Sequence, residues 1–226
     1  MNHRVTMFRP AVWLASVAAA VAALTLAPPA CAADPAPLAV TLGSGSVVWL
    51  EGTSTMHDFE SRTGEITVRF RREAEASDPA DVAGLDHLIR TNAVAGLEVE
   101  IPVASLRSGK SGLDKNLQKT LHADANPTIR YRLAHYSITG ADTSAMHADG
   151  TLTVAGRERP TSLAARAWRT PQGVWVEGVQ TLLMSDFDVK APTMMLGALK
   201  VGDRVTVHYR LLLVPGTGAQ STRTTE

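Results

Sequence analysis

Apolar and polar residues alternate along much of this chain, and this period of two constrains its fold more than any other feature. The clearest example is the segment 204–214, whose apolar face is formed by Val205, Val207, Tyr209, Leu211 and Leu213. Successive side chains of a strand point to opposite faces, so the pattern predicts strands with one buried and one wet face. Strands of this kind build antiparallel sheets, whereas parallel strands read as continuous apolar runs.

About eight segments carry the signal of a strand. They are 46–53, 59–72, 97–103, 130–138, 150–154, 162–168, 173–183 and 204–214. About eight antiparallel strands either stack as a sandwich or close as a barrel. Closure removes the exposed edges, and an eight-stranded barrel is wide enough for its own side chains or one slender ligand. We therefore expect an all-β, antiparallel fold, either a sandwich or a barrel.

One convincing amphipathic helix interrupts the strands, at residues 111–122. Leu113, Leu117 and Leu121 recur every four residues and share one face. The opposite, wet face is predicted to carry Asp114, Lys115, Gln118 and Lys119. A single short helix in a β chain predicts a curled sheet with a plug or a lid at one end. The polar segment 73–92 reads either as a long loop or as a loop with a weak helix near 86–90.

The N-terminus resembles a secretory leader. Arg4 and Arg9 precede the apolar run 11–27, and residues 30–32 have the small side chains of a cleavage site. We predict cleavage between Ala32 and Ala33. The expected division is a leader over 1–32, a barrel domain over 33–214 and a flexible tail over 215–226. The sequence leaves two alternatives open, which are an uncleaved membrane anchor and a lipidated Cys31.

Composition excludes several classes of function. Removal of the leader leaves 20 basic and 22 acidic residues, so no basic face for nucleic acid is expected. Cys31 is the sole cysteine and leaves with the leader, so neither a disulfide nor a cysteine nucleophile is expected. None of the seven histidines has the HxH or HExxH spacing of a metal site, and we expect no metal and no cofactor.

The predicted outer faces of the strands are charged. They carry Arg69, Arg71, Glu98, Glu100, Arg130 and Arg132. Charges at this density cannot face hydrocarbon, so we expect no membrane span in the mature protein. The oligomeric state is left open, a homodimer included.

Four segments together resemble the YceI-like family of exported bacterial proteins. They are Leu113–Tyr131, with a helix, a turn and a strand; GTLTVAGRERP at 150–160; SDFDVKAPTMMLGALKV at 185–201; and GTSTMHDF at 52–59. The resemblance covers Leu38–Val214 and implies a lipocalin-like barrel. It further implies a lumen that holds a polyisoprenoid chain, sometimes with a quinone-type head, or a fatty-acid-like ligand. The long segment 73–92 and the His57–Asp58 pair depart from the family pattern and leave the ligand open.

The candidate ligand-binding residues are apolar and aromatic residues of the expected lumen, with His57 at its mouth. They are Trp49, His57, Phe59, Phe70, Val99, Ile101, Leu113, Leu117, Ile129, Tyr131, Met184, Phe187, Met194, Met195, Val207 and Tyr209. The favoured function is an exported carrier of a long-tailed lipid, without enzymatic activity. One alternative is a structural module of the envelope whose barrel is filled by its own side chains. A second is a lipid-acting enzyme that uses His57 and Asp58, which otherwise form an ordinary turn.

Overall fold

The computed structural model describes residues 36–55, 57–141, 143–194 and 199–216, and for 193, 194 and 199 it describes the backbone alone. The predicted cleavage position between Ala32 and Ala33 lies outside these ranges, as do Cys31 and most of the predicted tail. Among the described residues, twelve strands form one sheet in which every pairing is antiparallel. The expected all-β, antiparallel class is confirmed.

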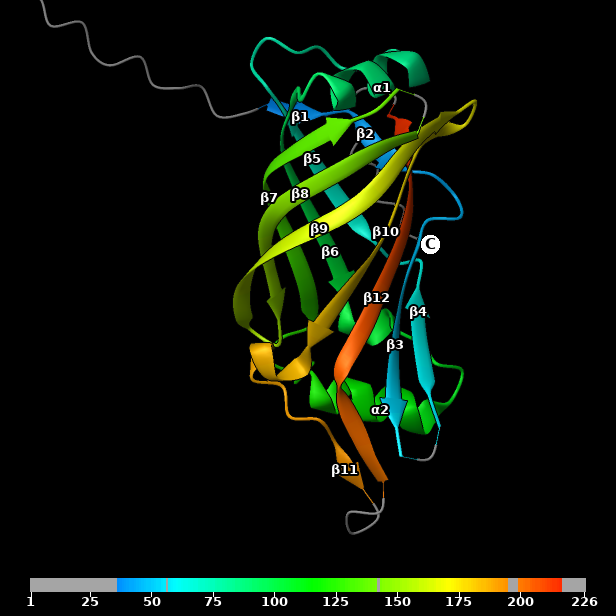
Figure 1. Cartoon of the computed structure of the whole chain (residues 1–226), viewed down its shortest axis with the longest axis vertical. Helices are drawn as coiled ribbons and strands as arrows, with labels where there is room; N and C mark the ends of the chain where they lie inside the picture. Colours follow the sequence, from blue (N-terminus) through cyan, green and yellow to red (C-terminus); the bar gives the residue numbers. More distant parts are fainter. Residues whose placement is uncertain (1–35, 56, 142, 195–198, 217–226) are drawn as a thin grey trace, which may run out of the picture. The chain divides into compact units, whose positions relative to one another are not determined.

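Figure 1 shows the strands winding into a curled sheet. Their bounds are β1 Ala36–Leu38, β2 Val40–Leu42, β3 Val47–Ser54, β4 Phe59–Thr63, β5 Thr67–Arg72, β6 Val94–Pro102, β7 Thr128–Thr139, β8 Thr143–Val154, β9 Arg157–Thr170, β10 Gly173–Leu183, β11 Thr193–Met194 and β12 Leu199–Pro215. The spatial order is β1-β5-β6-β7-β8-β9-β10-β12-β3-β4. The strands of six or more residues are β3, β5 to β10 and β12, which agrees with the expected number of about eight.

Short strands link the two sides of the sheet. At one end β1 pairs with β5 while the next strand, β2, pairs with the last residues of β12. At the other end Arg62 of β4 and Arg107 exchange two backbone hydrogen bonds, each 2.9 Å long. The two links hold strands from the two sides of the sheet together, so the sheet stays curled. The apolar faces of the long strands lie on the inside of the curl.

Several sequence-based strand boundaries were wrong, among them the start of β8, which begins at Thr143 rather than at residue 150. The segment 59–72 is two strands, because the chain turns at Gly64, and β4 and β5 lie near opposite edges of the sheet. The β8–β9 hairpin turns at Ala155 and Gly156, whose φ angles of 48° and 77° are both positive. Two consecutive positive φ values define the tight turn that suits twisted strands. Residues 157–160, expected in the connection, therefore belong to β9.

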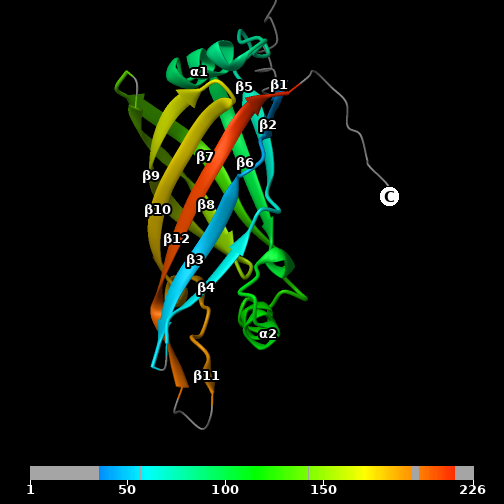
Figure 2. The same cartoon turned by 90° about the vertical axis from the view of Figure 1, so that its right-hand side faces the viewer.

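The described ranges contain two α-helices, where one was predicted and a second was left open. Helix α2, Ser111–Thr120, is the predicted one. The added helix α1, Val82–Arg90, begins at Asp81, whose carboxylate accepts a hydrogen bond from the Gly84 amide at 2.7 Å. Figures 1 and 2 show the two helices at opposite ends of the curled sheet. Helix α1 is the weak option that the sequence left open, and it is longer than the residues 86–90 considered for it.

Helix α1 closes its end of the sheet by burial. Leu85 and Ile89 are 1% and 3% exposed and pack in one apolar cluster with residues of the surrounding strands, namely Leu38, Val40, Phe70, Val94, Val174 and Leu213. The hydroxyl of Tyr136 on β7 donates to the Ile89 carbonyl at 2.9 Å. Arg90 donates to the Ser144 hydroxyl at 2.6 Å and ties the helix to β8. Apolar burial and these two bonds together hold α1 in place.

Gly150 on β8 is required by a close approach. A methyl group there would meet the ring of Tyr131 and the backbone carbonyl of Arg132. We expect Gly150→Ala to lower the free energy of unfolding by about 1–3 kcal/mol, because the backbone must shift. Gly112→Ala is the matched control, since nothing lies within 4 Å of its added carbon on α2. That change should raise stability by about 0.5–1 kcal/mol. Urea unfolding measures both, and equal effects would contradict the prediction.

Candidate functional site

The inside of the curled sheet is hollow. A cavity of about 320 Å³ extends between the strands and α2, and a smaller one of about 80 Å³ lies nearer α1. The two share walls formed by Leu97, Val99, Met146, Ala148, Val176 and Leu211. Together they form a lumen, a term used below for both cavities. Its larger part has the size of a small-molecule site.

Small inward-facing residues keep the lumen open. On β9, Leu163 and Ala165 line the cavity, whereas the intervening Ala164 is exposed on the outer face. On β8, Ala148 takes the corresponding inner position between Met146 and Gly150. Larger side chains at these positions would occupy the cavity. The structure therefore differs from a barrel packed solid by its own side chains.

Two tyrosines line the lumen with their hydroxyls already hydrogen-bonded. Tyr131 donates to the Ala148 carbonyl at 2.9 Å and Tyr209 donates to the Ala164 carbonyl at 3.1 Å. Each ring lies against an inward-facing glycine of a neighbouring strand, Gly150 or Gly178. Burial raises the pKa of Tyr209 to about 12 and holds the pKa of Tyr131 well above its usual range. Both phenols are therefore neutral and bonded to the sheet, so they add little polarity to the lumen.

The mouth of the lumen lies at the end that carries α2. Leu113 and Leu117 are half-buried and line the cavity, and Leu121 is buried at its edge. Phe187 lies in the 3-10 helix η2, Met184–Phe187, and belongs to the same apolar cluster as Leu121. Leu183 lines the cavity and is 37% exposed, which places it on the rim. The polar lining residues include Asn116 on α2 and Gln180 on β10.

The sequence predicted Asp114 on the wet face of α2, and this prediction was wrong. Its side chain is buried and accepts hydrogen bonds from the Ser108 amide at 2.7 Å and the Ser108 hydroxyl at 2.6 Å. These bonds hold the pKa of the carboxyl below its ordinary value, with the hydroxyl making the largest contribution. Asp114 therefore fixes the turn that leads into α2. Lys115 and Lys119 are exposed as predicted, and Gln118 is half-buried.

Most of the predicted site residues line the main cavity. These are Phe59, Val99, Ile101, Leu113, Leu117, Ile129, Tyr131, Met184, Phe187, Val207 and Tyr209. Phe70 lines the smaller cavity instead and packs in the cluster around α1. Met194 lies in β11, where only the backbone is described, and Met195 lies outside the described residues. The sequence thus identified one continuous surface from segments far apart in the chain.

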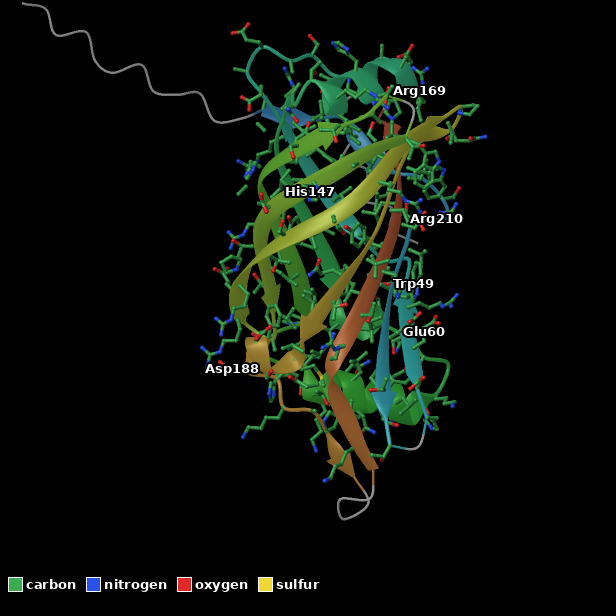
Figure 3. The ribbon with its side chains drawn as sticks, viewed as in Figure 1. Trp49, Glu60, His147, Arg169, Asp188 and Arg210 are labelled. Atoms are coloured by element: carbon green, nitrogen blue, oxygen red, sulfur yellow. The ribbon has the colours of Figure 1, made fainter. Side chains whose placement is uncertain are left out.

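Trp49 and His57 lie elsewhere. Trp49 is on the outer face of β3 (Figure 3). Its ring stacks on that of His208, with 4.7 Å between the ring centroids. His57 is exposed, and its ring nitrogen Nδ1 lies 3.2 Å from the backbone carbonyl of Asp58 rather than beside the carboxylate. Neither residue lines the lumen. The turn at 57–58 is held by Ser54, whose hydroxyl donates to the His57 carbonyl at 2.6 Å.

Sequence reasoning missed several lining residues. They include Val48, Leu50, Met146, Ala148, Leu152, Leu163 and Val176. The missed signal was alternation itself: Val48 and Leu50 flank the outward Trp49. On β8, Met146 and Ala148 line the cavity but precede Gly150, the first residue of the predicted segment. Extension of the pattern toward residue 143 would have found them.

The outer face of the sheet is charged, as expected. Glu100 is bonded by Arg69 at 2.8 Å and by Arg130 at 2.8 Å, and these two arginines, Arg69 first, lower the pKa of Glu100. Arg130 also contacts Glu98 at 2.9 Å. Within the described ranges no three histidine, cysteine or acidic side chains come together as a metal site. In the same ranges no helix is both long and apolar enough to cross a bilayer.

Comparisons with known proteins place this geometry in a family. The family model described as the YceI-like domain matches residues 34–213. BcnA of Burkholderia cenocepacia superposes with a TM-score of 0.57 at 14% identity, over 76% of this chain and 99% of its own. A polyisoprenoid binding domain from Saccharophagus degradans, implicated in plant cell wall breakdown, gives 0.55 at 10% identity, over 79% and 99%. At these identities the two structures show a shared fold. Among curated proteins, no match was found.

The Asp114 contact predicts a pH-dependent stability. A carboxyl whose pKa is lowered by folding stabilises the protein above its unfolded pKa, and loses that contribution as the pH falls through the folded value. We expect the stability gap between the wild type and Asp114→Asn to be largest near pH 7 and to shrink below about pH 4. Urea unfolding at pH 7 and pH 3 measures the gap. Asp124→Asn, at an exposed position, is the control, and its stability should differ little from that of the wild type at either pH. A stability gap for Asp114→Asn that is the same at pH 7 and pH 3 would contradict the role given to the charge of Asp114.

Proposed function

The chain belongs to the YceI-like family, and on this premise we propose that it binds one long-tailed amphiphile with the tail in the lumen and the head at the mouth. The candidate ligand classes are polyisoprenoid, quinone-like and fatty-acid-like lipids. The S. degradans relative, described as a polyisoprenoid binding domain, supports the first of these classes. The observation that carries the proposal is the hollow, apolar lumen, in which both tyrosine hydroxyls are already bonded to backbone carbonyls.

The size of the lumen supports a slender tail. An engineered cavity of about 150 Å³ admits one benzene molecule, so 320 Å³ holds a chain segment of about a dozen carbons. Each buried methylene group contributes about 0.8 kcal/mol, or about 10 kcal/mol for twelve, before the cost of association. A dissociation constant of 1 μM corresponds to about 8 kcal/mol. An association cost of at least about 4 kcal/mol leaves about 6 kcal/mol from the tail, so micromolar binding requires further contacts, from the head at the mouth or from a longer chain.

The proposal includes export and excludes catalysis. Arg4, Arg9 and the apolar run that follows support removal of residues 1–32, so the carrier would act in the periplasm or as a secreted protein. Binding requires no reacting group. His57 and Asp58 form an exposed turn away from the lumen, which favours a carrier over a lipid-acting enzyme.

Filling the lumen tests the proposal directly. Ala165→Phe places a ring in the cavity, whereas Ala164→Phe places the same ring on the outer face one residue earlier. We expect Ala165→Phe to weaken binding of a fluorescent C16 fatty acid and of a farnesyl probe at least tenfold, and Ala164→Phe to bind like the wild type. Fluorescence titration measures affinity, and native mass spectrometry of protein purified from an exporting host measures bound cargo. Wild-type protein that is always empty and takes up neither probe would favour the structural module.

The role of α2 in closing the mouth has its own test. Leu117→Asp puts a carboxylate on the apolar face that lines the cavity, and Lys115→Asp puts one on the exposed face of the same helix. We expect Leu117→Asp to release a bound probe at least about tenfold faster, since an unpaired charge there favours an open mouth. Lys115→Asp should release it at the wild-type rate. Equal rates in a stopped-flow release assay would remove the closing role from the leucine face.

A further inference from the structure

Helix α2 is amphipathic in a way that closing the lumen does not explain. Its apolar face, with Leu113 and Leu117, is turned to the cavity, and the opposite side carries Lys115 and Lys119, both exposed. Neither lysine forms an ion pair with any described residue. Lys110, at the start of the helix, is also exposed and without an ion pair in those ranges.

The positive charge of this segment is not balanced locally. From Arg107 to Thr120 the sequence contains four basic residues and one acidic residue, Asp114, which is buried and bonded to Ser108. Other charges at this end of the barrel largely cancel. Arg157 contacts Asp188 at 2.8 Å, for example, and Figure 3 shows Asp188 at the end of the sheet where α2 lies.

The opposite end has the reverse balance. Around α1, the arginines Arg72 and Arg90 are paired with Asp78 and Asp86, at 3.8 and 2.9 Å. The exposed residues Glu73, Glu75 and Asp81 outnumber the exposed arginines Arg71 and Arg169 there. The molecule is therefore more positive at its mouth than at its closed end. Near an anionic surface, this charge difference would orient the molecule with its mouth toward the surface.

The rim of the mouth adds apolar surface to this charge. Leu183, 37% exposed, lines the cavity at the end of β10, and Leu113 lines it from the first turn of α2. The apolar face of α2 is turned to the lumen, so it is the lysine side of the helix and the exposed Leu183 that can contact the head-group region of a bilayer. Each lysine near an anionic membrane contributes to attraction, and the effect falls off within a Debye length.

We infer that the α2 end of the barrel docks on an anionic lipid bilayer, with Lys110, Lys115 and Lys119 over the head groups and the mouth facing the membrane. An amphiphile would then pass between bilayer and lumen without exposing its tail to water. The purpose of docking rests on the proposed function, but docking itself is measurable on protein without cargo.

Vesicle co-sedimentation tests the inference with two charge-matched variants. Lys115→Glu/Lys119→Glu and Arg71→Glu/Arg169→Glu change the net charge equally, at opposite ends of the barrel. On vesicles of 70% phosphatidylcholine and 30% phosphatidylglycerol, we expect the wild type to bind, and to bind less as salt rises. The lysine variant should lose at least about tenfold in partitioning. The arginine variant should stay within about twofold of the wild type, and pure phosphatidylcholine should bind none of them.

Three results would overturn docking by this face. They are an equal loss in both variants, binding to neutral vesicles as strong as to anionic ones, and no binding by the wild type, which would redirect the basic face to an acidic protein. Thermal unfolding confirms that each variant is folded. Binding of the farnesyl probe in solution separates the two proposals: a lysine variant that fills its lumen but does not sediment is the expected result. Docking by protein that takes up no probe would overturn the carrier function alone.

Discussion

The inward and outward alternation of side chains on antiparallel strands is the constraint on which the rest of the structure depends. Strand β12 shows it best, since Val205, Val207 and Tyr209 line the lumen while Arg204 and Arg210 are exposed on the other side. A slip of one residue in its pairing with β3 or β10 would exchange the two faces. It would bring charge into the cavity and expose apolar residues to water. Gly178, directly opposite Tyr209, and Gly150, beside the ring of Tyr131, oppose such a slip, because a methyl group at either position would meet the ring.

Much of the fold could be predicted from the sequence because alternation is a local signal. The bounds of β10 match the predicted segment, and the leucines of α2 share one face as their spacing indicates. Helix α1 was harder to predict. Its stability comes from Leu85 and Ile89 packing against strands far away in the sequence, and the segment around it is polar. The break at Gly64 was missed for a similar reason, since separate partners for β4 and β5 decide it.

The candidate site was predictable to the same extent as the strand faces. Residues such as Val99 and Ile129 followed from their place in the pattern. Trp49 and His57 were chosen for their chemistry, and both proved to lie outside the lumen, Trp49 through cross-strand stacking and His57 through a local turn. The burial of Asp114 could not be read from helical spacing, because its partner Ser108 precedes the helix. Side-chain partners outside an element limit what the periodicity of that element can reveal.

The seal that α1 makes with the sheet limits how a carrier of this shape can operate. With Leu85 and Ile89 packed across the far end, a guest that enters at the mouth leaves by the same route, tail last. A lumen of this kind has one opening and is not a channel through the molecule. A membrane that supplies the ligand and a membrane that receives it would therefore have to contact the same mouth, one after the other. Delivery would then require the protein to leave one membrane before it binds the other.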